Sequence, residues 1–277
     1  MTDRSRVWFI TGASAGLGRA LAEAALDRGD RVAATARDPD RVADLADRGR
    51  AVPIGLDVTA PAEVRAGVAA ALDAFDRLDV VVNNAGFGLF GALEELSDDD
   101  LRRQFETNVF GALAVIRAAL PHLRRQRSGH IVQISSLEGV APVVAGEVAY
   151  AGTKFAVEGV AEALAAEVAH LGIRVTIVEP GPLRTEFAAG AVAKAPDSAD
   201  YAESVGKALE WFAELAGRQP NDPALVAAAI AQAVDAPEPP LRLALGEEAV
   251  TAIREKLDRQ RRELDAWEHV ATAYGDE

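Results

Sequence analysis

Two residues that could transfer a proton stand four positions apart in the sequence, Tyr150 and Lys154. The alanine-rich segment 149–171 that contains them reads as a helix, and an i,i+4 spacing places both side chains on one helix face. A cation beside a phenol favours the phenolate and lowers the phenol pKa from about 10 towards neutrality. The pair is therefore predicted to give or take a proton near physiological pH, although the spacing alone also occurs in helices without a catalytic role.

The elements that must position this pair alternate along the chain. Runs of β-branched residues without polar alternation are typical of strands buried on both faces, and regular strand–helix alternation predicts a parallel sheet. Strands are expected at 7–10, 31–35, 51–56, 80–82, 130–135, 174–178 and 241–245. Helices are expected at 17–28, 39–47, 61–75, 98–126, 149–171, 223–235 and 247–270. The fold class is predicted as α/β, a doubly wound, Rossmann-like parallel sheet of about seven strands with helices on both faces.

A single domain is expected for residues 1–277. Residues 6–187 would form the cofactor-binding and catalytic core, and 221–277 the last helix–strand unit with a C-terminal helix. Between them, residues 187–220 have a helical pattern in which no strand is expected. This segment is predicted to form a mobile helical lid over the carboxyl ends of the strands, where open α/β sheets bind ligands.

The composition of the chain limits the classes of binding partner and site that it can have. The net charge of −14 is spread along the chain, which argues against nucleic acid and anionic membrane surfaces. No apolar run approaches the roughly 18 residues of a membrane span, and the N-terminus lacks the apolar stretch of a signal peptide. With no cysteine and four scattered histidines, neither a thiol nucleophile nor a metal site is expected. A cytoplasmic location is the resulting expectation.

A glycine-rich segment joins the first expected strand to the first expected helix. It reads Thr11-Gly12-Ala13-Ser14-Ala15-Gly16-Leu17-Gly18. Glycines at such a junction permit a tight turn and a close approach of the backbone to a pyrophosphate, which the helix N-terminus can bind. The spacing differs from G-x-G-x-x-G, and a turn that binds nothing is the alternative. The strand before it and the helix after it favour a dinucleotide.

This order of motifs resembles the short-chain dehydrogenase/reductase family, in its single-domain branch. The similarity covers residues 6–187, about two thirds of the chain. Besides the glycine loop and the Tyr150 and Lys154 pair, it rests on Leu56-Asp57-Val58, Asn83-Asn84-Ala85-Gly86, Asn108-Val109-Phe110-Gly111, Ile134-Ser135-Ser136 and Pro180-Gly181.

The resemblance implies a catalytic set of Asn108, Ser136, Tyr150 and Lys154. Tyr150 would be the general acid in carbonyl reduction and the general base in alcohol oxidation, while Lys154 would lower its pKa and bind the nicotinamide ribose. Ser136 would hydrogen-bond the substrate oxygen, and Asn108 would hold a water that links Lys154 to solvent. The cofactor-binding residues that it implies are Gly12, Ser14, Gly16, Leu17, Gly18, Arg37, Asp57, Val58, Asn84, Tyr150, Lys154, Pro180, Leu183 and Thr185.

Two adjacent serines, Ser135 and Ser136, end the fifth expected strand, and neighbouring strand side chains point to opposite faces, so only one can reach the site. In the family the reactive serine stands three residues before a glycine, and Gly139 follows Ser136 by three. Capping of the strand end is the alternative role. The interval from Ser136 to Tyr150 is one residue longer than is usual, which predicts a bulged loop at 137–149.

The second expected strand ends in Thr35-Ala36-Arg37, without the Asp or Glu that usually binds the ribose hydroxyls of NAD. A guanidinium matches phosphate geometry, so Arg37 favours NADP(H), with NAD(H) as the alternative cofactor. Arg37 could equally be one of many surface arginines. Ala15 argues against a strong preference for NADP(H), because many NADP-using relatives carry a second basic residue at this position.

Three residues are candidates for the substrate pocket. Glu138 and Glu147 lie in the loop that lines this pocket in the family, where relatives often carry small or apolar residues. A carboxylate that faced the cavity would favour a substrate with an amine or several hydroxyls; exposure to solvent is the alternative and the commoner state of charged loop residues. Trp211, with Phe212, would supply an apolar wall from the lid.

The leading functional hypothesis is an NADP(H)-dependent oxidoreductase that interconverts a ketone or aldehyde and an alcohol by hydride transfer. A dinucleotide-binding sensor or scaffold without turnover is the alternative, and it would not need the set around Tyr150. A sugar-nucleotide epimerase or dehydratase is a third hypothesis, although such proteins have longer chains and a different glycine loop. The resemblance also implies a homodimer or homotetramer through a four-helix contact of the helices near 107–126 and 149–171.

Overall fold

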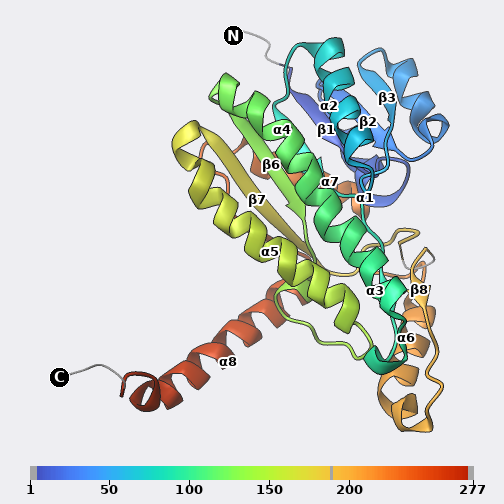
Figure 1. Cartoon of the computed structure of the whole chain (residues 1–277), viewed down its shortest axis with the longest axis vertical. Coiled ribbons are helices and arrows are strands. Elements are labelled where there is room, and N and C mark those ends of the chain that lie inside the picture. Colours follow the sequence, from blue (N-terminus) through green and yellow to red (C-terminus); the bar gives the residue numbers. More distant parts are fainter. Residues whose placement is uncertain (1–4, 188–189, 274–277) are drawn as a thin grey trace.

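A parallel sheet of seven strands lies at the centre of the molecule, in a computed structural model that describes residues 5–187 and 190–273 (Figure 1). Neighbouring strands all run parallel, in the order β3-β2-β1-β4-β6-β7-β9. The strands are β1 (Val7–Ile10), β2 (Arg31–Ala36), β3 (Ala51–Gly55), β4 (Val80–Asn83), β6 (Gly129–Ile134), β7 (Ile173–Pro180) and β9 (Arg242–Leu245). The predicted doubly wound α/β fold is confirmed.

Helices cover both faces of the sheet, as its continuously apolar strands require. On one face, α1 (Gly16–Asp27) and α7 (Pro223–Asp235) pack together over β1, β2 and β4. On the other face, α2 (Pro61–Phe75), α4 (Ala112–Gln126) and α5 (Val148–Val168) form a second core, and α4 and α5 lie in front of β6 and β7 in Figure 1. All residues of β1 and β4 are buried because they lie between these two helix layers.

Two of the predicted helices differ in their geometry. The stretch expected at 39–47 is a 3₁₀ helix, Pro39–Arg48. The stretch expected at 98–126 begins with α3 (Asp98–Phe105), which the Ser97 side chain caps, and continues through a π-helical turn, Glu106–Gly111, into α4. Such turns often occur at functional sites, and this one contains Asn108.

The expectation that no strand occurs between residues 185 and 221 is wrong. β8 (Val192–Ala193) pairs in parallel with β5 (Leu89–Phe90), which was also not predicted. Each strand has two residues, too few for an alternating pattern to show in the sequence. The rest of this segment has the expected helical character, with α6 (Lys207–Leu215) as its longest element. Residues 188–189 of the predicted lid lie outside the described residues.

The C-terminal helix α8 (Glu247–Ala271) follows β9 and projects away from the sheet (Figure 1). Its first turns pack through Ala249, Ala252 and Ile253 on the loop that follows β6. From Leu257 to Ala271 all of its residues are exposed. None of the helices in the described part of the chain is both long and apolar enough to cross a membrane.

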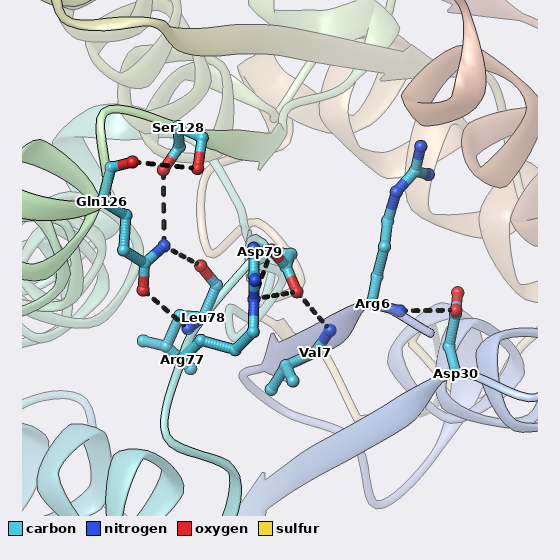
Figure 2. Close-up of polar contacts among 8 residues, drawn as sticks. All are labelled: Arg6, Val7, Asp30, Arg77, Leu78, Asp79, Gln126 and Ser128. Carbon is cyan, nitrogen blue, oxygen red and sulfur yellow. Dashed lines mark hydrogen bonds and ion pairs between the residues drawn. The ribbon is translucent and has the colours of Figure 1, made fainter. Parts of the chain in front are cut away.

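Polar contacts tie together the amino ends of the central strands, at the edge opposite the candidate site (Figure 2). The Asp79 carboxylate accepts from the Val7 N–H at 2.9 Å. The Asp30 carboxylate accepts from the Arg6 N–H at 2.8 Å and from the indole N–H of buried Trp8 at 2.9 Å. Burial would otherwise leave these N–H donors without acceptors. The contacts therefore fix the amino ends of β1 and its neighbouring strands.

Candidate active site

The sheet order reverses between β1 and β4, because the chain runs outward through β2 and β3 and then returns to β4 on the other side of β1. At such a switch point, loops leave neighbouring strands in opposite directions and open a crevice beyond their carboxyl ends. The structure brings to this edge the glycine loop after β1, Asn84 after β4, the two serines after β6 and residues 180–185 after β7.

The glycine loop has a backbone suited to a pyrophosphate. Gly12 has a φ of +67°, which side chains disfavour. At Gly18 a Cβ would lie 2.4 Å from both the Asn84 amide nitrogen and the Gly12 carbonyl oxygen. A cavity of about 460 Å³ adjoins the loop, and its lining includes Ser14, Ala15, Gly16, Arg19, Arg41 and Thr185. Since Gly16 at the N-terminus of α1 lines this cavity, the loop fits a dinucleotide cofactor.

Asn84 holds the glycine loop against β4. Its side-chain nitrogen donates to the Thr11 and Gly12 carbonyl oxygens at 2.9 and 3.1 Å. The Thr11 hydroxyl in turn accepts from the Asn84 N–H at 2.9 Å. The amide nitrogen of Asn84 therefore positions the loop, and the contact of Asn84 with the cofactor stays a prediction. From the other side, the Thr185 side chain lies next to Gly16.

Three predicted adenosine contacts lie at the ends of β2 and β3. Arg37 directly follows β2 and is exposed, and no ion pair within the described residues engages its guanidinium. Asp57 closes a turn by accepting from the Thr59 N–H at 2.9 Å and the Thr59 hydroxyl at 2.7 Å. Val58 is buried next to Gly111. The side chains of the predicted residues Leu17 and Leu183 pack into the adjoining core, and the Leu183 carbonyl oxygen accepts from the Thr185 N–H at 2.8 Å.

Tyr150 and Lys154 lie together in the first turns of α5, and both are buried. The Lys154 Nζ lies 5.5 Å from the centroid of the Tyr150 ring and donates to the Ile134 carbonyl oxygen at 3.0 Å. Burial lowers the pKa of Lys154 to about 8, and the Glu158 carboxylate opposes this shift. Burial also raises the pKa of the Tyr150 phenol, so in the protein alone this pKa is not lowered as the sequence argument expected.

The two serines diverge as neighbouring strand residues must. Ser136 interacts through its hydroxyl with the Tyr150 phenol, which lowers the phenol pKa and partly offsets the effect of burial. The Ser136 hydroxyl also accepts from the Glu138 N–H at 3.2 Å. Ser135 is buried on the other side, beside Glu158. Only Ser136 is thus placed to share a substrate oxygen with Tyr150.

Asn108 links three segments around the site. Its side-chain oxygen accepts from the Phe87 N–H at 3.0 Å, and its nitrogen donates to the Phe87 carbonyl oxygen at 3.0 Å and to the Thr153 hydroxyl at 3.1 Å. The π-helical turn thereby holds the loop after β4 against α5. These bonds use both N–H donors of the Asn108 side chain and one of the two acceptor positions of its oxygen.

Aromatic residues enclose Tyr150, and sequence reasoning missed most of them. The Phe90 ring lies 5.8 Å from the Tyr150 ring, and the Phe187 ring lies 5.7 Å from it on the lid side. Phe212 of α6 stacks on Phe90 at 5.1 Å. The Trp211 ring lies 5.1 Å from the Phe212 ring, and Trp211 is 44% exposed. Phe90 and Phe187 stand in short irregular segments, where no periodic pattern marks a buried face.

Glu138 and Glu147, for which solvent exposure was the alternative, are both buried. Their carboxyl groups are close enough that each shifts the pKa of the other. Both are close enough to Tyr150 that their charge raises the phenol pKa. Burial, followed by the Glu138 carboxyl, raises the pKa of Glu147 well above its usual range, so Glu147 holds a proton at neutral pH.

A second group of charges, two buried carboxylates and an exposed arginine, lies near Lys154. Arg242 of β9 forms ion pairs with Glu158 of α5 and, at 2.8 Å, with Glu179 of β7. Burial raises the pKa of Glu158 to about 7, and the Ser135 and Arg242 contacts oppose the shift. Sequence reasoning missed this group, although Glu158 follows Lys154 by four residues and the same spacing rule could have found it.

Comparison with known proteins agrees with this geometry. A family model described as short chain dehydrogenase matches residues 6–196. The oxidoreductase BOA17 of Botryotinia fuckeliana is 39% identical over 89% of this chain and 90% of its own. A short-chain dehydrogenase from Streptomyces avermitilis has a crystal structure that superposes with a TM-score of 0.89, at 42% identity over 99% of this chain and 100% of that one.

A more distant structure shows a ligand. The alcohol dehydrogenase of the archaeon Thermococcus sibiricus, complexed with 5-hydroxy-NADP, has a TM-score of 0.72 at 27% identity over 87% of this chain and 96% of that one. The site and sheet define a dinucleotide-type α/β oxidoreductase. More narrowly, the chain belongs to the short-chain dehydrogenase family, which confirms the resemblance found in the sequence.

Proposed function

We propose that this protein is an NADP(H)-dependent oxidoreductase that interconverts a ketone or aldehyde and an alcohol, with Tyr150 as the general acid or base. The observation that carries the proposal is the meeting of Tyr150, Ser136 and Lys154 beside a glycine loop that fits a dinucleotide. A solved relative that is an alcohol dehydrogenase with a bound NADP derivative supports the same reaction class.

Each residue of the site has its own role in such a reaction. A bound nicotinamide cofactor supplies or accepts the hydride. Ser136 donates a hydrogen bond to the carbonyl oxygen, where negative charge develops, and Tyr150 gives that oxygen its proton. Lys154 lies against the Tyr150 ring, and its positive charge favours the phenolate that remains. In alcohol oxidation Tyr150 takes the proton back.

NADP(H) is the cofactor that we propose, because Arg37 is exposed directly after β2 with its guanidinium unpaired within the described residues. A free guanidinium there can pair with a 2′-phosphate. Gly12, Gly16 and Gly18 would receive the pyrophosphate, and Thr185 would cover it from the β7 side.

The direct test is to incubate purified protein with NADPH or NADH and a panel of ketones and aldehydes, following the absorbance of the reduced nicotinamide. We expect consumption of NADPH with at least some carbonyl compounds. A protein that binds NADPH, measured by fluorescence, but turns over none of a broad panel would instead be the sensor or scaffold of the alternative hypothesis.

We further propose a homodimer or homotetramer that uses α4, α5 and the π-helical turn. Phe110 on this turn is 54% exposed and Phe155 on α5 is 45% exposed, which is typical of a subunit contact. Phe155→Glu is expected to shift the mass in solution, measured by light scattering, to that of a monomer. Leu264→Glu, an equally drastic change on the projecting part of α8, is the control and should leave the mass unchanged. A monomeric wild-type protein at micromolar concentration would contradict the proposal.

Residues 187–220 are proposed to move when substrate binds. The Phe187 ring lies 5.7 Å from the Tyr150 ring, on the side from which a substrate would approach, so this segment must shift to admit one. Trypsin is expected to cut at Lys207, which is exposed, and cofactor with a ketone should slow this cut. Cutting at exposed arginines of α8 provides an internal control. Equal rates at Lys207 with and without ligands would indicate a rigid surface element.

A further inference from the structure

Two buried carboxyl groups lie beside Tyr150 without a cation to balance them. Glu138 and Glu147 are 7% and 4% exposed. No lysine, arginine or histidine forms an ion pair with either in the part of the chain that the structure describes. Glu138 accepts from the Val143 N–H at 3.3 Å, whereas Glu147 contacts only the Glu138 carboxyl, and its buried Oε2 receives no N–H or O–H donor from the described residues.

This arrangement costs stability unless something else completes it. Two neighbouring carboxyl groups with little access to water resist ionising together, so the pair carries at most one negative charge. A buried charge without a partner destabilises a fold, and groups that break this rule are concentrated at functional sites. The loop from 137 to 149 therefore presents buried carboxyl oxygens that a positively charged hydrogen-bond donor would satisfy.

The pair also lies in the loop that joins Ser136 to Tyr150. Glu147 precedes Tyr150 by three residues at the start of α5, and Glu138 follows Ser136 by two. Both carboxyl groups act on the Tyr150 phenol through their charge, which places them close to the atom that would donate the proton. Because Tyr150 and Ser136 would both contact the substrate carbonyl oxygen, a substrate group bound by the carboxyl pair would belong to a carbon near that carbonyl.

Building on the proposed function, we propose that Glu138 and Glu147 bind a protonated primary amine on the carbon next to the reacting carbonyl. The preferred substrates are then α-amino ketones, or the corresponding 1,2-amino alcohols. An ammonium group provides three N–H donors and a positive charge, which satisfies both carboxylates once the shared proton has left for solvent. A hydroxyl group would provide one donor and no charge, and so matches the pair less well. Phe90 and Phe187 on the Tyr150 ring favour an apolar group on the other side of the carbonyl.

Three ketones of nearly equal size test this proposal: α-aminoacetophenone, α-hydroxyacetophenone and propiophenone, which differ only in an ammonium, hydroxyl or methyl group. The wild-type enzyme is expected to show a kcat/KM for the amino ketone about 10- to 100-fold above that for propiophenone, as for a hydrogen bond to a charged group. Glu147→Gln keeps the shape of the side chain but removes its charge, and should reduce this ratio towards one. Glu138→Gln should act in the same direction. Glu255→Gln on the exposed part of α8 is the matched control, with the wild-type ratio.

A purely structural carboxyl pair would lower activity on all three ketones together and leave the ratio unchanged, which would overturn the proposal. A preference for the hydroxy ketone that Glu147→Gln abolishes would also overturn it, in favour of a hydroxyl site. Binding gives a second measurement that needs no turnover. With NADP present, α-aminoacetophenone should raise the Tm of the Tyr150→Phe variant more than propiophenone does, and adding Glu147→Gln should remove the difference. If no ketone is reduced, the proposed function fails, and this binding measurement still decides whether the amine site exists.

Discussion

Replacing Tyr150 with phenylalanine is expected to lower kcat for ketone reduction by about 10²–10⁴-fold, the usual contribution of a positioned general acid. The ring itself should remain packed between Phe90 and Phe187, since only the hydroxyl is removed. The dissociation constant of NADPH should therefore change little. Steady-state kinetics and fluorescence titration of NADPH measure the two quantities separately.

Two further variants make this result specific. Lys154→Ala should weaken NADPH binding as well as turnover, because Lys154 is proposed to contact both the ribose and Tyr150. Tyr201→Phe removes the hydroxyl of another tyrosine, which interacts with Glu94 rather than with the catalytic residues, and should leave kcat near the wild-type value. If Tyr150→Phe kept near-full ketone reductase activity, Tyr150 would not be the proton donor and the proposed mechanism would be lost.

Replacing Arg37 with alanine is expected to weaken NADPH binding by roughly 10- to 100-fold and to leave NADH nearly unchanged. The magnitude follows from a charge-assisted hydrogen bond of about 1.5–3 kcal/mol, at about 1.4 kcal/mol per tenfold. The side chain is exposed at the end of β2, so its removal should not disturb the core.

The comparison must be made at one ionic strength, because screening changes the strength of exposed charge pairs. Arg65→Ala, which removes an exposed arginine from α2, is the control for a general effect of net charge. Equal weakening of NADPH and NADH by Arg37→Ala would show that Arg37 does not contact the 2′-phosphate. The proposal of NADP(H) would then lose its main support.

The sequence by itself determined the fold and the chemical class of the site. Buried strands such as β1 and β4 must be apolar along their whole length, and this requirement is visible residue by residue. The glycine loop depends on the local geometry of a turn. The Tyr150 and Lys154 pair depends on the spacing of residues along a helix. Local rules of this kind act between residues a few positions apart, so a linear pattern records them.

Only the tertiary structure decided what surrounds Tyr150. The burial of Glu138 and Glu147, the contact of Phe187 with the Tyr150 ring and the pairing of β5 with β8 all join residues with no fixed sequence spacing. Burial also reversed the expected direction of the Tyr150 pKa, because desolvation of the phenol outweighs the contacts that favour its charged form. Desolvation depends on every group packed around a side chain, and those groups are known only when the chain has folded.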